Sequence, residues 1–127
     1  MRHDSLRSYA GQLARLVWRF NFAVNKALIT YREPVMDMQL VQERIANAAM
    51  ELFAATCVLS RWDAELSTVG RNGHDATDHV AADLFVRRAL RKTRHFLRGL
   101  GDNDDAAMLA TADAVLGKGA AASRNGA

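Results

Sequence analysis

Apolar residues recur every three or four positions over most of this 127-residue chain. This recurrence gathers apolar side chains on one side of a helix that has 3.6 residues per turn. The alternation of β-branched residues that is typical of strands is missing, and alanine and leucine dominate. The pattern therefore predicts an all-α protein.

The first two predicted helices meet at the single proline. One helix is expected from about Ser5 to about Tyr31 and the next from about Val35 to about Ser67. Pro34 disfavours the α conformation at the residue before it and fits the first turn of a new helix. A connection this short implies either an antiparallel neighbour or a kinked continuation of the first helix, and we favour the antiparallel neighbour.

Two further helices follow a glycine-containing loop over residues 67–75. Asp75 is the expected N-cap of the third helix, and Gly99 is placed for the left-handed residue that closes it after Arg98. The fourth helix should start near Asp102. Its apolar stripe consists of Met108, Leu109, Ala112, Val115 and Leu116.

Short connections and one apolar stripe per helix predict an antiparallel up-down-up-down four-helix bundle. We assign residues 1–117 to this single domain and residues 118–127, which are small and polar, to a disordered tail.

The second helix has the most regular stripe, and we interpret it as the spine of the bundle. Arg44 and Glu51 are expected to pair at its rim, and Cys57 is expected to be buried as a small apolar residue. One cysteine cannot form an internal disulfide, which favours the cytoplasm or another reducing compartment. The stripe consists of Met38, Val41, Ile45, Ala48, Leu52, Ala55 and Leu59.

Groups suited to catalysis are sparse. His74 with Asp78, and Asp75 with His79, lie four positions apart, a spacing at which metal ligands share a helix face. These four residues are the basis of one hypothesis, a small metal-dependent enzyme. However, aspartates are also expected at a helix start as caps and first-turn charges, and no further ligand completes either pair. The sequence therefore favours neither a metal site nor a catalytic residue.

Residues 86–98 carry six basic side chains and no acid, in a chain whose net charge is +3. A solvated helix face, an anionic membrane surface at about 1 kcal/mol per basic residue, and nucleic acid are the three interpretations. Nucleic acid is disfavoured because no aromatic platform is interleaved, and Trp18 and Trp62 are expected in the core or at its rim. The candidate anion-contacting residues are Arg87, Arg88, Arg91, Lys92, Arg94 and Arg98.

The stretch RIANAAMELFAATCVLSR, residues 44–61, resembles the C-terminal extension of the very-long-chain acyl-CoA dehydrogenases. The resemblance extends over residues 5–117, and the second helix carries its specific part. The matching positions are Arg44, Ile45, Ala46, Asn47, Ala49, Met50, Glu51, Leu52, Phe53, Ala54, Val58, Leu59, Ser60 and Arg61.

In that family FAD and acyl-CoA bind to an upstream core that also holds the catalytic glutamate. Nothing in this chain resembles the β-domain of that core, so no catalytic or cofactor-binding residue is carried over. The resemblance implies a non-catalytic helical domain of a fatty acid β-oxidation flavoenzyme, with FAD in the parent enzyme and no cofactor in this chain.

The resemblance also implies the partners. The first partner is the catalytic core or a partner subunit of a homodimer. The second is an anionic membrane surface, to which the domain would bind peripherally. The alternative function is a free-standing basic helical module that binds a protein or nucleic acid.

Overall fold

The computed structural model describes residues 4–69 and 76–125 of the chain. No strand occurs in these residues, so the predicted all-α class and its four helices are confirmed. The elements are η1 (Asp4–Leu6), α1 (Arg7–Tyr31), η2 (Glu33–Asp37), α2 (Gln39–Val69), α3 (Ala76–Gly99) and α4 (Asp105–Asn125).

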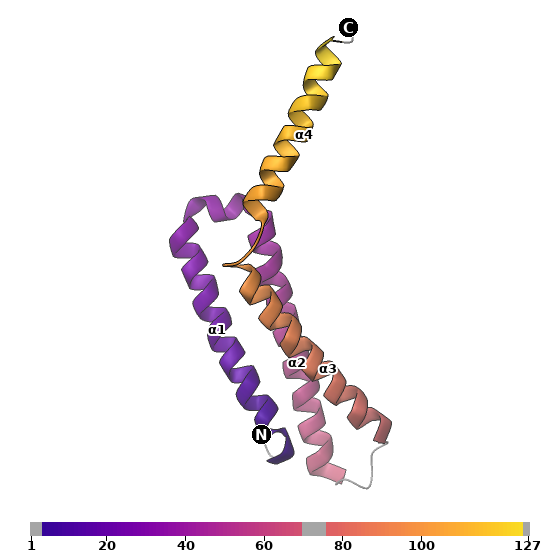
Figure 1. Ribbon diagram of the computed structural model, residues 1–127. Helices are drawn as coiled ribbons and strands as arrows, with labels where there is room; N and C mark the ends of the chain where they lie inside the picture. Colours follow the sequence, from indigo (N-terminus) through magenta and orange to yellow (C-terminus); the bar gives the residue numbers. More distant parts are fainter. Residues whose placement is uncertain (1–3, 70–75, 126–127) are drawn as a thin grey trace.

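Three of the helices form one packed body. Figure 1 shows α1, α2 and α3 running in alternating directions side by side, with α4 continuing away from their upper end. The packing of α2 against α3 is the most extensive, and α1 lies against both helices. We call these three helices the three-helix body.

The chain turns from α1 into α2 through a short 3-10 helix, so α2 begins four residues later than predicted. Arg32 ends α1 with a φ of 50° and donates its backbone N–H to the Leu28 carbonyl oxygen at 2.9 Å. Pro34 then lies in η2 and not in the first turn of α2. The proline still separates the two helices, because its ring is compatible with the start of a helix and not with its interior.

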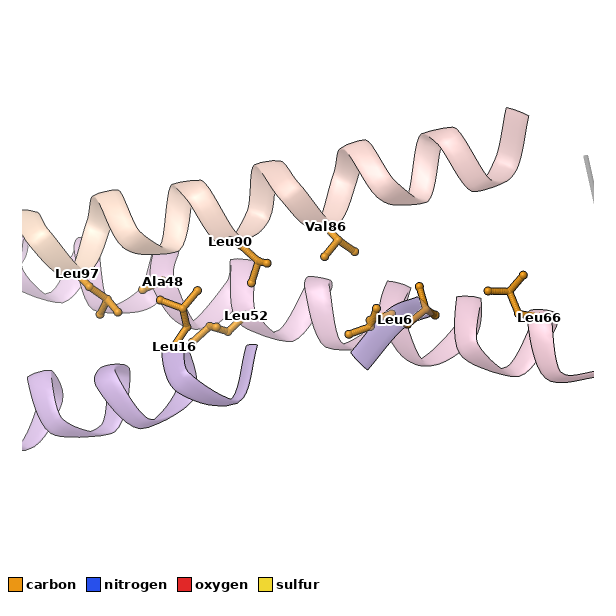
Figure 2. Close-up of a cluster of buried hydrophobic side chains, with 9 residues drawn as sticks. Leu6, Leu16, Ala48, Leu52, Leu66, Val86, Leu90 and Leu97 are labelled. Carbon is orange, nitrogen blue, oxygen red and sulfur yellow. The ribbon is translucent and has the colours of Figure 1, made fainter. Parts of the chain in front are cut away.

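The core lies where α2 meets α3 and α1 (Figure 2). The stripe predicted for the second helix is confirmed, since five of its seven residues are buried and Met38 and Ile45 pack at the edge. In α3, Thr93 is fully buried and donates its hydroxyl to the Ala89 carbonyl oxygen at 2.8 Å. The main cluster consists of Leu6, Leu16, Ala48, Leu52, Leu59, Leu66, Val86, Leu90 and Leu97.

Two positional predictions are wrong. Cys57 is exposed and not buried, because it lies two positions, or about 200° of helix rotation, beyond the buried Ala55. Gly99 is the last residue of α3 and does not adopt the left-handed conformation. Its lack of a side chain serves a close contact with Arg44, described below.

The fourth helix is longer than predicted and packs differently. It continues to Asn125, through most of the segment for which a disordered tail was predicted, and residues 126–127 lie outside the described residues. From Ala106 to Gly117 every residue is exposed. Its predicted apolar stripe therefore does not join the core of the three-helix body.

Substitutions at the adjacent residues Leu52 and Phe53 test which face of α2 is buried. Leu52 is 6% exposed and Phe53 is 73% exposed. We expect Leu52→Ala to lower the free energy of unfolding by about 2–5 kcal/mol, because it leaves a cavity in the core. Phe53→Ala should change it by no more than about 0.5 kcal/mol. Urea denaturation followed by circular dichroism measures both, and equal losses would show that the buried face of α2 is misassigned.

Candidate functional site

The structure divides the six basic residues of α3 into two groups. The first group, Arg87, Lys92 and Arg94, makes contacts inside the three-helix body. Lys92 Nζ lies 3.0 Å from Glu51 Oε1 on α2, and Arg94 Nη2 donates to Gln12 Oε1 on α1 at 2.9 Å. These side chains link α3 to its neighbours, so they are less available to an external anion than the sequence predicts.

Arg87 belongs to a polar cluster that joins α3 to the first part of α1. Its Nε lies 2.8 Å from Asp83 Oδ2 and donates to the Tyr9 hydroxyl at 2.8 Å, while that hydroxyl donates to Asp83. Burial, followed by the hydrogen bond to Asp83, raises the pKa of Tyr9 above its ordinary value. A phenol that these partners hold in its neutral form is suited to joining α1 and α3 by hydrogen bonds, and not to acid–base chemistry near neutral pH.

The second group, Arg88, Arg91 and Arg98, is exposed. Within the described part of the chain, these three guanidinium groups make no ion pair or hydrogen bond. Arg88 and Arg91 lie on the side of α3 opposite its buried residues, and Arg98 lies nearer to α1, where it also lines the groove described below. We call this set the outer cation row, and it is the part of the predicted anion-contacting site that the structure leaves available.

The structure describes only two of the four residues of the metal hypothesis, Asp78 and His79. His74 and Asp75 lie outside the described residues, and Asp78 is exposed in the first turn of α3. His79 Nδ1 accepts a hydrogen bond from Trp62 Nε1 at 2.8 Å, which orients the ring toward α2. Across residues 4–69 and 76–125, no three histidine, cysteine or acidic side chains gather as metal ligands.

A groove between α1 and the end of α3 is a feature that the sequence did not reveal. It has a volume of about 530 Å³ and a floor that includes Ala23 and Ala27. Trp18 and Phe22 stack at its edge, with ring centroids 5.8 Å apart, and Trp18 is 68% exposed. We call it the α1–α3 groove, and it is lined by Trp18, Arg19, Phe22, Ala23, Lys26, Ala27, Thr30, Tyr31, Leu97, Arg98, Leu100 and Gly101.

The α1–α3 groove combines apolar and cationic groups. Arg19, Lys26 and Arg98 lie along it, and no acidic residue lines it. It was missed because its two sides lie far apart in the sequence, and because Trp18 was expected in the core or at its rim. The combination suits an occupant that is apolar on one side and negatively charged.

The start of α4 is held against α2 by a bidentate ion pair. Arg44 Nη1 and Nη2 each lie 2.6 Å from one oxygen of Asp105, and the two side chains are 22% and 17% exposed. Hydrogen bonding to Arg44 lowers the pKa of Asp105, and the same bond raises the pKa of Arg44. The expected pairing of Arg44 with Glu51 is wrong, because Glu51 pairs with Lys92.

The turn before α4 is built around this pair. A Cβ atom on Gly99 would lie 3.2 Å from Arg44 Nε, so the glycine lets the arginine side chain cross α3 closely. Asn103 donates its Nδ2 to the Gly99 carbonyl oxygen at 2.8 Å and accepts from the Asp105 N–H at 3.1 Å. These contacts set the direction in which α4 leaves the three-helix body.

The architecture is that of an all-helical domain with no assembled catalytic centre in its described residues. The family model for the "ACAD9/ACADV, C-terminal domain" matches residues 4–121. The chain therefore belongs to this family of acyl-CoA dehydrogenase C-terminal domains, as its second helix suggested. No solved structure matches it. Among the described helices, none combines the length and the apolar character needed to span a membrane.

The Arg44–Asp105 pair should make the attachment of α4 sensitive to acid. Because the native pKa of Asp105 is lowered, the pair contributes fully above the ordinary aspartate pKa and is lost as the pH falls through the lowered native value. We expect amide hydrogen exchange in the first turn of α4 to accelerate over that pH range, relative to the intrinsic rate.

The matched comparison uses two aspartates of α4. Asp105→Asn should show the faster relative exchange already at neutral pH, whereas Asp113→Asn, at an exposed position, should behave like the wild type. Identical exchange in all three proteins would show that the pair does not hold α4.

Proposed function

We propose that this chain is a non-catalytic docking domain that packs on the catalytic core of an acyl-CoA dehydrogenase. Its family membership supports an association with such a core. The observation that carries the proposal is that α1 is apolar on two opposite sides. Leu16 and Ala27 are buried against the three-helix body, while Trp18, Phe22 and Ile29 are exposed on the other side.

A helix with two apolar sides is normally covered on both of them. Trp18, Phe22 and Ile29 follow one another at spacings of four and seven residues, so they share one face of α1. Exposed clusters of large apolar side chains mark interaction sites in soluble proteins. Stacking of Trp18 on Phe22 pre-orders two of these side chains, which lowers the entropy cost of binding.

Ile29 offers the sharpest test of docking on the core. It is 74% exposed and does not line the α1–α3 groove. We expect Ile29→Glu to weaken binding to a separately produced, FAD-containing core of an acyl-CoA dehydrogenase of this family by at least about tenfold, which corresponds to about 1.4 kcal/mol. Titration calorimetry measures the affinity.

Met50 on α2 supplies the matched control, because it is also a large apolar residue and is 60% exposed. Met50→Glu introduces the same charge on another surface and should bind the core like the wild type. The proposal would be wrong if the wild-type chain did not bind the core, or if Ile29→Glu and Met50→Glu bound it equally.

A second candidate function is docking on an anionic membrane surface through the outer cation row. The observation that favours it is the absence of internal ion-pair partners for Arg88 and Arg91 within the described residues. Each basic residue near an anionic lipid surface contributes about 1 kcal/mol. Arg94, in contrast, is engaged with Gln12, so it is a poorer candidate than the sequence indicated.

Co-sedimentation with vesicles tests the membrane candidate. We expect the wild type to bind phosphatidylserine-containing vesicles in a salt-dependent manner and to bind phosphatidylcholine vesicles much less. Arg91→Glu should reduce the partition coefficient about fivefold or more. Arg15→Glu makes the same charge change on α1 and should have a smaller effect. Equal effects would indicate attraction by net charge and not by the outer cation row.

A further inference from the structure

The apolar stripe of α4 has no covering surface within the described part of its own chain. Met108, Leu109, Val115 and Leu116 are between 56% and 71% exposed. With Ala112 they lie within about 120° of the helix circumference, at 100° per residue. We call these five residues the α4 stripe. A helix that projects alone into water is only marginally stable, so a partner surface for the stripe would stabilise α4.

The turn before α4 and the first part of α4 have the opposite charge to the α1–α3 groove. Residues 102–117 contain four aspartates and no basic residue or histidine. Asp105 is already paired with Arg44, and Asp113 is exposed on α4. The groove contains Arg19, Lys26 and Arg98 and no acid. Both surfaces also combine this charge with apolar side chains. The segment and the groove thus have the complementary properties of two halves of one interface.

The α4 helix does not lie in the groove of its own chain. The Arg44–Asp105 pair holds the start of α4 against α2, and Figure 1 shows the helix extending away from the three-helix body from that point. Docking on another molecule requires no internal contact to be broken.

We propose that α4 of one copy of this chain occupies the α1–α3 groove of a second copy, and that the two copies do so reciprocally. Such a two-fold exchange of one helix is a common route to a dimer. Each three-helix body would thereby gain a fourth helix. The completed bundle would then have the four helices that the sequence pattern predicts. The inference does not rest on the proposed docking to a catalytic core.

The dimensions of the two surfaces agree. The α4 residues 105–117 and the α1 residues 18–31 that border the groove each form a helical segment about 20 Å long, at 1.5 Å per residue. Ala23 and Ala27 at the floor leave room for close approach of another helix. The α4 stripe would face this floor, and Asp113 would lie near the groove cations.

Solution mass provides the first test. We expect light scattering to give twice the 14.0 kDa chain mass for the wild type at the upper end of a concentration series. Leu109→Glu combined with Leu116→Glu should give a monomer. Ala110→Glu combined with Ala114→Glu adds the same charge to the opposite, exposed side of α4 and should remain a dimer.

These variants leave the core residues of the three-helix body unchanged, and circular dichroism checks that they fold. A monomeric wild type at all concentrations would overturn the proposal. So would a dimer that both double variants leave intact, or one that both disrupt equally.

A disulfide between the two surfaces distinguishes a second copy from the same chain. In a Cys57→Ser background, Thr30→Cys places a thiol on the groove and Ala112→Cys places one in the α4 stripe. The proposal predicts a dimer-sized band on a non-reducing gel after mild oxidation. An intrachain disulfide, which leaves the mass at one chain, would show that α4 folds onto its own groove and would overturn the second-copy assignment.

Discussion

Burial of the α2 stripe is the interaction on which the rest of this structure depends. α2 is the only one of the four helices whose buried face extends along nearly its whole length, from Val41 to Leu66 among the described residues. Both α1 and α3 lie against it. Ala48 and Ala55 are almost completely buried and leave space for close packing. Exposed ion pairs such as Lys92–Glu51 contribute little free energy by themselves. The packing of the helices on α2 therefore determines which side chains can form these pairs.

The sequence predicts those parts of the fold that depend on burial within a single helix. The stripe of α2 is regular, and five of its seven residues are buried, because a recurrence of three or four residues places these side chains on one face of a helix.

Features that depend on residues far apart in the sequence could not be predicted in the same way. Glu51 lies seven positions from Arg44, two helical turns along α2, which predicts a pair, whereas Asp105 is 61 positions away and becomes a partner only through the α3–α4 turn. The α4 stripe is correctly recognised as apolar, but periodicity does not state what an apolar face contacts. The α1–α3 groove likewise combines two helices whose separate patterns give no indication of a cavity.

The basic residues of α3 show that a count of charges does not define a binding surface. Three of the six bind Asp83, Glu51 and Gln12, so they stabilise the arrangement of the helices. Only the outer cation row faces solvent without such partners among the described residues. A guanidinium already paired with a carboxylate attracts an external anion less strongly, because the two opposite charges largely cancel at a distance.

The exposed face of α1 and the α1–α3 groove are both uncovered surfaces with apolar residues. They differ in charge, so they suit different partners. The exposed face of α1 includes Ile29, which does not line the groove. The central residues of this face are apolar, and cationic residues lie only at its edge. The α1–α3 groove is cationic along its length and matches the acidic segment over residues 102–117. Because Trp18 and Phe22 belong to both surfaces, a helix seated in the groove would cover part of the α1 face. Occupation of the groove by α4 and docking of a larger partner on α1 would therefore influence each other through these two rings.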